Sequence, residues 1–161
     1  MVRIIPNFSL ILPDIRSCHN VGAMFRTADA CGVGQIYLTG YTATPPKPQI
    51  DKVSLGAEQW MPWKHYQDTE RLIKRLKKQG VYLVALEKTE TSEEIGNVSF
   101  DFPLALIVGN EVDGVATDIL SLCDHVVHIP MRGKKESLNV SVAAGIALYV
   151  IGKALSTKKT F

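Results

Sequence analysis

The sequence predicts an α/β fold with a mainly parallel sheet that is covered by helices on both faces. Short apolar runs rich in β-branched residues alternate along the chain with stretches of helical period. The apolar runs are nearly continuous, which is typical of strands buried on both faces. The 161 residues suit one domain, because a chain of this length buries about two-thirds of its unfolded surface without a disulfide or a metal.

Each expected element follows from a local pattern. Runs of apolar and β-branched residues predict strands at Phe8–Pro13, Gln35–Thr39, Val81–Glu87, Leu104–Gly109 and His125–Pro130. Helical spacing of apolar residues predicts helices at Asn20–Cys31, Thr69–Gln79, Val115–Leu122 and Asn139–Leu155. The proline-rich run Thr44–Pro48 is interpreted as a stiff surface loop.

The first expected helix has four features. Asn20 is a good N-cap residue, and a buried stripe is expected at Val21, Met24, Phe25 and Ala28. Arg26 falls nearly opposite that stripe. Gly22 costs up to ~1 kcal/mol relative to alanine inside a helix, so we expect a ligand or another chain to approach the backbone there.

Composition and charge exclude several classes of protein. With 46% hydrophobic and 21% charged residues, the chain is neither disordered, collagen-like nor a coiled coil, and a net charge of +2 excludes a polycation. We expect no signal peptide and no membrane span, because the apolar stretches are shorter than ~20 residues. Cys18, Cys31 and Cys123 are odd in number and lack C-x-x-C spacing, which indicates reduced thiols in a cytoplasmic protein.

Several common motifs are missing or incomplete. The sequence has neither a phosphate-binding loop of the G-x-x-x-x-G-K type nor a G-x-S-x-G nucleophile elbow. Gly32–Tyr37 begins like a dinucleotide fingerprint, but tyrosine replaces its third glycine and a strand follows it. His125 and His128 would point to opposite faces of a strand, so with Cys123 they form no metal site. We expect such strand-end histidines to bond to backbone groups.

Polar and glycine residues gather where ligands bind in open α/β sheets, beyond the carboxyl ends of the strands. The loops concerned are Asp14–Asn20, Asn110–Gly114 and Met131–Asn139. Ser137 and Asn139 can cap the last helix, whose small residues Ala143, Ala144, Gly145 and Ala147 suit close packing against a sheet or a twin helix.

Three motifs in these regions carry a family resemblance. They are N-x-G-x-x-x-R-T at Asn20–Thr27, G-N-E-x-x-G at Gly109–Gly114, and I-P-M-x-G…S-L-N-V-S-V-A-A at Ile129–Ala144. With these three motifs in this order, the chain closely resembles the SpoU/TrmH family of S-adenosylmethionine-dependent RNA ribose 2′-O-methyltransferases, within the SPOUT superfamily. The similarity extends from about Phe8 to Leu155.

The resemblance implies a fold and a cofactor. Residues 1–161 would form a single methyltransferase domain with a deep C-terminal trefoil knot, and two chains would form a homodimer with a composite active site. S-adenosylmethionine would be the methyl donor, without a metal. The residues implied around it are Leu86, Glu87, Val108, Gly109, Asn110, Gly114, Ile129, Met131, Ser137 and Leu138.

The resemblance also implies catalytic residues, with Arg26 central and Asn20, Glu111, Ser137 and Asn139 completing the site. A ribose 2′-hydroxyl would take the sulfonium methyl, so the protein must align the two groups and help to remove the proton. We favour Arg26 as a cation that orients a phosphate or hydroxyl over Arg26 as a base. Glu111, from the same or the partner subunit, would hold its guanidinium, while Ser137 and Asn139 position the hydroxyl or shape the donor pocket.

RNA requires a cationic track. One short helix contains a basic cluster, which we expect to form a solvent-exposed face: Arg71, Lys74, Arg75, Lys77 and Lys78. Lys134 and Lys135, beside the expected site, are better candidates for RNA contact, and Lys153, Lys158 and Lys159 follow in the last helix or after it. We expect no N-terminal RNA-binding domain, and we slightly favour tRNA over rRNA as the substrate because a minimal dimer can grip a small structured RNA.

Two alternatives stay open. A non-catalytic RNA-binding protein of the same fold would have eroded motifs, whereas here all three are complete. A flavodoxin-like nucleotide-binding domain would lack the paired motifs around Asn20/Arg26 and Ser137/Asn139, and flavin would colour the purified protein yellow.

Overall fold

The computed structural model describes residues 5–158 and contains an all-parallel sheet of seven strands. The strands follow the order β3-β2-β1-β6-β4-β7-β5 across the sheet. Their bounds are β1 Phe8–Pro13, β2 Gln35–Thr39, β3 Trp63–Tyr66, β4 Tyr82–Leu86, β5 Glu93–Glu94, β6 Leu104–Ile107 and β7 His125–His128. The predicted α/β class and parallel sheet are confirmed.

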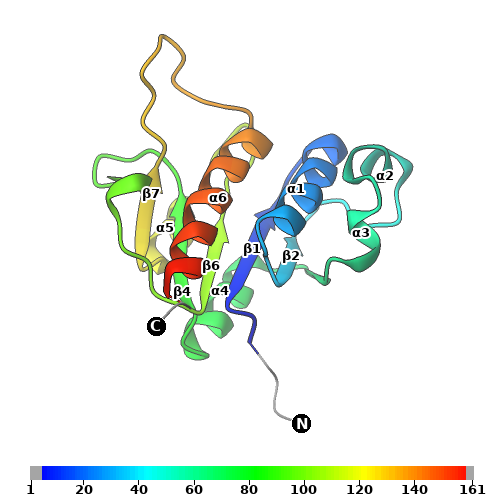
Figure 1. Cartoon of the computed structure of the whole chain (residues 1–161), viewed down its shortest axis with the longest axis horizontal. Helices are drawn as coiled ribbons and strands as arrows, with labels where there is room; N and C mark the ends of the chain where they lie inside the picture. The colour runs from blue at the N-terminus through cyan, green and yellow to red at the C-terminus, as the bar shows by residue number, and fades with distance from the viewer. Residues whose placement is uncertain (1–4, 159–161) are drawn as a thin grey trace.

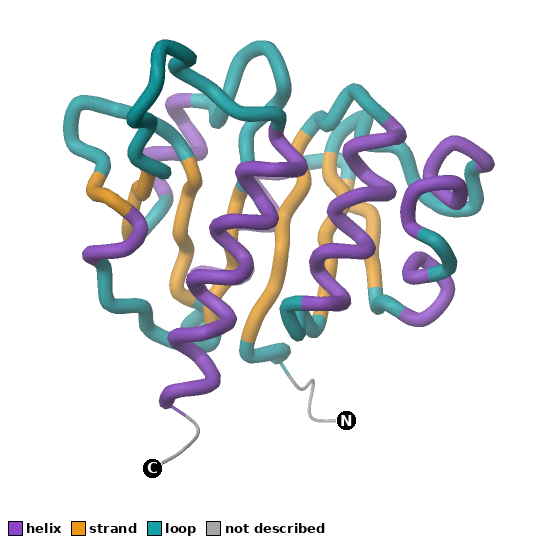
Figure 2. The backbone as a smooth tube through the Cα atoms, turned by 45° about the horizontal axis from the view of Figure 1, so that its top comes forward, coloured by secondary structure: helices purple, strands orange, loops and turns teal. Residues whose placement is uncertain are grey.

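Helices cover both faces of the sheet, as predicted. One face carries α1 (Cys18–Ala30), α2 (Pro48–Ser54), α3 (Ala57–Trp60) and α6 (Val140–Lys158), and the other carries α4 (Thr69–Lys78) and α5 (Thr117–Leu122). A 3₁₀ turn spans Ile95–Asn97. Successive residues of β1 serve the two layers, because Leu10 and Leu12 pack with α1 and α6 whereas Ile11 packs with α4. Figures 1 and 2 show α1 and α6 side by side on one face.

The predicted elements match the structure unevenly. The strands at Phe8–Pro13 and Gln35–Thr39 are confirmed residue for residue, and the other predicted elements differ by a few residues at their ends. The sequence did not predict β3, an edge strand whose Lys64 and His65 are exposed, nor the two-residue β5. It also missed α2 and α3, because Pro48, assigned to a loop, begins α2.

The prediction that Asn20 caps α1 is wrong. The helix begins two residues earlier, and the Ser17 hydroxyl accepts a hydrogen bond from the Asn20 N–H at 3.2 Å. Asn20 itself is 5% exposed. Its amide side chain is therefore available for tertiary contacts. The apolar stripe of the helix is buried and Arg26 is exposed, both as predicted.

The close approach expected at Gly22 comes from the same chain, not from a ligand or another chain. A Cβ atom there would lie 2.6 Å from the Ile50 carbonyl oxygen and 3.0 Å from the Val53 Cβ, both on α2. Because backbone atoms cannot give way easily, only glycine allows α2 to pack this closely.

Gly22→Ala is therefore expected to lower the free energy of unfolding by about 1–3 kcal/mol, since extra atoms in a packed site force the backbone apart. Chemical denaturation measures it. Gly96→Ala is the control, because a Cβ there meets nothing within 4 Å. Equal stability of the two variants would contradict the packing argument.

The last helix packs closely against α1. A Cβ on Gly145 would lie 3.4 Å from the Thr27 methyl, and one on Gly152 would lie 3.1 Å from the Cys31 carbonyl oxygen. The small residues thus allow two helices of one chain to lie side by side.

Among residues 5–158, α6 is the one helix whose length and mean hydropathy of 1.6 match a membrane span. This corrects the expectation that every apolar stretch is too short. The same features occur in core helices of soluble proteins, and Ala144, Ala147, Leu148 and Ile151 of α6 are buried in the core. The opposite side of α6 carries exposed apolar residues.

The two histidines of β7 bond to side chains, which corrects the expectation of backbone partners. His125 contacts the Tyr82 hydroxyl at 3.1 Å and a Glu93 carboxylate oxygen at 2.6 Å. His128 contacts the Ser92 hydroxyl at 2.9 Å. Within the described part of the chain, no group of three histidine, cysteine or acidic side chains is placed to hold a metal ion.

Candidate active site

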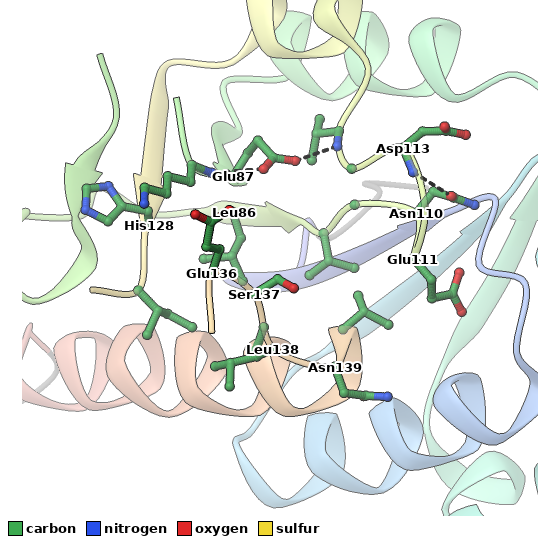
Figure 3. A pocket seen from close by; sticks show the side chains of 18 of the residues that line it. Leu86, Glu87, Asn110, Glu111, Asp113, His128, Glu136, Ser137, Leu138 and Asn139 are labelled. Carbon is green, nitrogen blue, oxygen red and sulfur yellow. Dashed lines mark hydrogen bonds between the residues drawn. The ribbon is translucent and has the colours of Figure 1, made fainter. Parts of the chain in front are cut away.

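A cavity of about 780 Å³ opens beyond the carboxyl ends of β4, β6 and β7, under the segment that leads into α6 (Figure 3). Parallel strands bring these ends together at one edge of the sheet. All the residues that the resemblance implies for the methyl donor lie in its wall: Leu86, Glu87, Val108, Gly109, Asn110, Gly114, Ile129, Met131, Ser137 and Leu138. The wall also contains Glu111 and Asn139, together with Lys88, His128 and Glu136, which were not predicted.

The loop between β6 and α5 depends on two glycines. Asn110 and Gly114 exchange backbone hydrogen bonds of 3.1 and 3.0 Å, which close the loop on itself. A Cβ on Gly109 would lie 2.6 Å from the Gly114 carbonyl carbon. Gly114 has a φ of +68°, which favours glycine. The loop therefore needs both glycines to form this wall of the cavity.

Glu87 ties this loop to the end of β4. One carboxylate oxygen accepts from the Val115 N–H at 2.8 Å and the other from the Lys88 N–H at 2.9 Å. A Cβ on Gly114 would fall on the carboxylate. Glu87 therefore joins two walls of the cavity, as Figure 3 shows.

The Asn110 side chain is occupied by protein contacts. Its amide nitrogen donates to the Asp14 carbonyl at 2.5 Å and to the Tyr41 hydroxyl at 2.9 Å. Its amide oxygen accepts from the N–H groups of Val112 at 2.8 Å and Asp113 at 3.1 Å. The side chain thus fixes the loop, and mainly backbone atoms of this segment are available to a ligand.

Glu111, Asn20 and Asn139 form one network although they lie far apart in the sequence. The Asn20 amide nitrogen donates to Glu111 at 3.0 Å, and the Asn139 amide nitrogen donates to the Asn20 amide oxygen at 3.2 Å. Glu111 also accepts from the backbone N–H groups of Arg16 at 2.9 Å and Ser17 at 3.0 Å. The start of α1, the β6–α5 loop and the start of α6 therefore meet beside the cavity.

These contacts lower the pKa of Glu111. Burial acts in the opposite direction and is the largest single influence, but the hydrogen bonds from Arg16, Asn20 and Ser17 together outweigh it. The Glu111 carboxylate is therefore charged near neutral pH. Its role within one chain is to hold the start of α1 in place.

The last helix starts at the cavity. The Asn139 amide oxygen accepts from the Ser141 N–H at 2.8 Å, as a capping residue does, so the predicted cap is present at Asn139. Ser137 is exposed two residues before it and faces the cavity (Figure 3).

Arg26 is not brought to the cavity within one chain. It is exposed on α1 and does not line the cavity wall. Glu111 bonds to the start of α1 and not to the Arg26 guanidinium. A single chain therefore assembles all the predicted site residues except Arg26.

The cations lie on different sides of the molecule. Lys134 and Lys135 are exposed on the segment between β7 and α6, which extends outward from the sheet edge (Figure 1). The basic cluster lies on α4, on the opposite face from α6, where Lys74 pairs with Glu70 and Lys77 pairs with Asp124. Lys159 lies outside the described residues.

Arg16 and Tyr41 are two contact residues that the sequence did not single out. They bond to the neighbouring residues Glu111 and Asn110 respectively. The polar loop after β1 was a signal for Arg16, whereas nothing in the pattern around Tyr41 distinguishes it from an ordinary loop residue.

The cavity suits a small ligand with apolar and polar parts. Its volume lies within the range usual for cofactor sites. Leu86, Ile129 and Leu138 offer apolar surface, and the glycine loop offers backbone N–H and C=O groups. These groups can hold a planar heterocycle by its faces and its polar edge. The adjacent amides and carboxylate can orient a second reactant by hydrogen bonds.

Comparison with known proteins gives one family and several relatives. Residues 7–149 match the model of the SpoU rRNA methylase family. The chain is 33% identical over 144 residues to a putative TrmH family tRNA/rRNA methyltransferase, YacO, of Bacillus subtilis, covering 89% of this chain and 57% of the relative. It is 35% identical over 137 residues to a tRNA (guanosine(18)-2′-O)-methyltransferase of Aquifex aeolicus, covering 84% of this chain and 64% of that one.

Solved structures agree with this likeness. A TrmH/SpoU tRNA modifying enzyme of A. aeolicus superposes with a TM-score of 0.86 at 29% identity, covering 95% of this chain and 77% of that one. An AdoMet-bound rRNA methyltransferase of Sinorhizobium meliloti superposes with a TM-score of 0.86 at 28% identity, covering 92% and 57%.

Proposed function

The chain belongs to the SpoU methylase family, and on that premise we propose that it transfers a methyl group from S-adenosylmethionine to a ribose 2′-hydroxyl of RNA. The three motifs predicted this membership. The chain spans a little over half the length of the first curated relatives, 57% and 56%. Activity, substrate and partners are therefore proposals that rest on the site itself.

One observation carries the proposal. Asn20, Glu111 and Asn139 come from three separate motifs and join in one hydrogen-bonded network at the mouth of the cavity. A structural role for each residue alone would not require them to meet at a ligand-sized opening. This argues against a protein of the same fold with a decayed site.

The cavity residues fit the methyl donor. Leu86, Ile129 and Leu138 can pack on the adenine ring, and backbone groups of the β6–α5 loop can bond its edge. When bound there, S-adenosylmethionine supplies an activated methyl group on a positively charged sulfur. No metal is needed for such a transfer, because the methyl group is already activated.

The protein's contribution is alignment of the acceptor. Asn139 lines the cavity and can hold the ribose hydroxyl by a hydrogen bond, with Ser137 near it at the cavity edge, while Asn20 holds the Asn139 amide in place. Arg26 supplies the cation that orients a phosphate or the hydroxyl and eases loss of its proton. The new C–O bond would form as the C–S bond breaks, S-adenosylhomocysteine would leave as a neutral thioether, and the hydroxyl proton would pass to solvent.

Incubation with methyl-labelled S-adenosylmethionine tests the proposal, with total tRNA and ribosomal RNA as separate acceptors. We expect label in RNA and a colourless protein that binds S-adenosylmethionine. Binding without transfer to either RNA would favour the non-catalytic alternative, and a yellow protein with flavin would favour the flavodoxin-like one. We infer a slight preference for tRNA over rRNA. We also infer that Lys134 and Lys135 contact the RNA near the site. A cytoplasmic location belongs to the same proposal.

We propose further that two chains form a dimer with composite active sites. An apolar stripe is exposed along α6 and the residues just before it: Val142 by 51%, Ile146 by 39% and Tyr149 by 66% on the helix, and Leu138 by 39% two residues before its start. Such a contiguous stripe is typical of a protein interface. Arg26 lies on the neighbouring helix α1, where it is exposed and does not line the cavity of the same chain. A second chain on this face explains both features if Arg26 serves the partner's cavity.

Val142→Glu is expected to yield a monomer without methyl transfer activity, because a carboxylate in the apolar stripe opposes burial. Light scattering after size-exclusion chromatography measures the mass. Gln79→Glu makes the same charge change at the residue that follows α4, on the opposite face of the sheet, and is expected to stay dimeric. A fully active Val142→Glu monomer would rule out a composite site.

The knot and the extent of the domain remain part of the proposal. In the sheet β6 lies between β1 and β4. The segment after β7 passes the cavity at the ends of β4 and β6 and leads into α6, which packs beside α1 (Figure 2). This path supports a C-terminal trefoil knot within a single domain spanning residues 1–161. Knots are rare, so the support comes from this path and from the family.

A further inference from the structure

Tyr41 combines exposure with fixed geometry. The residue is 63% exposed, yet its hydroxyl accepts a hydrogen bond from the Asn110 amide at 2.9 Å and its N–H donates to Asp14 at 2.9 Å. The next residue, Thr42, is anchored by its hydroxyl, which donates to the Leu12 carbonyl at 2.7 Å. Tyr41 therefore presents a flat aromatic ring to solvent from a rigid support.

The Tyr41 ring lies next to the methyl-donor cavity, because Asn110, which bonds to the tyrosine hydroxyl, lines that cavity. It lines a second cavity of about 710 Å³. The two cavities share the wall formed by Asn110, Asp113, Gly114 and Val115. Asn110, which holds the tyrosine, is followed directly by Glu111 of the hydrogen-bonded network. A ligand that spans both cavities would therefore pass over Tyr41 close to the site of methyl transfer.

Charge limits which part of an RNA can enter the second cavity. Its wall contains the carboxylates of Asp14, Asp68, Glu70, Asp113 and Asp118. These groups repel a phosphate but accept hydrogen bonds from the N–H groups of a neutral base. Arg16 is exposed two residues from Asp14 and forms no ion pair within residues 5–158. Its guanidinium is thus available to a phosphate outside the cavity.

We propose that an unpaired nucleotide beside the methylated ribose stacks its base on Tyr41, with its phosphate toward Arg16. This inference rests on the proposed function and specifies the form of RNA that the site accepts. Bases that are splayed out of a loop commonly stack on aromatic side chains, whereas paired bases cannot. The acceptor nucleotide is therefore expected in a single-stranded loop or end rather than in a duplex.

Kinetics with total tRNA test the ring. Tyr41→Ala is expected to raise the KM for RNA about tenfold or more, as loss of one base–aromatic stack does, with kcat and S-adenosylmethionine affinity unchanged. Tyr41→Phe keeps the ring and is expected to stay close to the wild-type KM. Trp60→Ala is the matched control, because Trp60 is a 60% exposed aromatic residue, tethered to Asp29, outside both cavities. Its KM is expected to match the wild-type value.

Fluorescence gives a readout independent of activity. Short single-stranded RNAs that carry 2-aminopurine are expected to lose fluorescence on binding to the wild type, and to lose much less on binding to Tyr41→Ala. Equal quenching by both proteins, or equal KM values for Tyr41→Ala and Trp60→Ala, would overturn the inference. If no RNA accepts a methyl group but the quenching still depends on Tyr41, the proposed function would be overturned and the stacking inference would stand.

Discussion

Arg26→Lys and Arg26→Ala are both expected to reduce methyl transfer by about 10²–10³-fold, the usual effect of removing one oriented donor from a reaction centre. Lysine carries the charge but not the planar, forked donors of a guanidinium, so it cannot replace bidentate orientation. S-adenosylmethionine affinity should not change, because Arg26 is not among the residues that line the donor cavity and its proposed contact is with the acceptor. Steady-state rates and calorimetric titration measure the two quantities.

The orienting role is favoured on energetic grounds. For any arginine to act as a base near neutral pH, its pKa must fall from ~12.5 to ~7.5, which requires about 7 kcal/mol at about 1.36 kcal/mol per unit. Full activity of Arg26→Lys would contradict orientation by the guanidinium. Lys52→Ala removes an exposed cation from α2 and serves as the control.

Mixing variants tests where Arg26 acts. If it serves the partner's cavity, inactive Arg26→Ala and inactive Glu111→Gln should regain activity when unfolded and refolded together. A mixed dimer would then contain one site with both native residues. No recovery, with mixed dimers demonstrably present, would mean that Arg26 and Glu111 of the same chain act in one site, and this would exclude the composite site.

Glu111→Gln is expected to lower methyl transfer about 100-fold, because displacement of reacting groups by about 1 Å has an effect of that size. The carboxylate accepts from the Arg16 and Ser17 backbones and the Asn20 amide. A glutamine presents N–H groups where one of its oxygens now accepts, so at least one of these contacts is lost. Glu90→Gln, an exposed change outside the cavity, is the control.

The same variant makes a prediction about pH. Because the hydrogen bonds keep the pKa of Glu111 below the ordinary 4.5, the native state gains stability from the charged form above pH 4.5, and this gain is lost as the pH falls through the lowered value. The wild type should therefore be more stable than Glu111→Gln at neutral pH, with the difference shrinking in acid. Denaturation curves across this range measure it, and a difference that grew in acid would contradict the assignment.

Strands that are buried on both faces of the sheet were predictable from the sequence. β1 and β2 are covered on both faces, so their apolar runs mark them completely. The sequence did not predict β3, because an edge strand needs no continuous apolar run and its Lys64 and His65 face solvent. The cap of α1 was misplaced because Ser17 and Asn20 are both capping residues, and the helix begins at the first of them.

The site was predictable where it follows from strand ends. Leu86, Val108 and Ile129 come at or directly after parallel strands, whose carboxyl ends must meet at one edge. The contact of Asn20 with Glu111 spans 91 positions and that with Asn139 spans 119. Local periodicity contains no information about such contacts, and only the family motifs pointed to them. Tyr41 had no signal, because its role depends on Asn110 across 69 positions.

Alkaline hydrolysis of the labelled RNA tests the position of the methyl group most directly. A 2′-O-methyl group removes the hydroxyl that alkali uses to cleave the chain. Label transferred by the wild type is therefore expected in alkali-resistant dinucleotides, and nucleoside analysis should give a 2′-O-methylnucleoside. Label released in mononucleotides, with methyl groups on the bases, would contradict ribose methylation by this site.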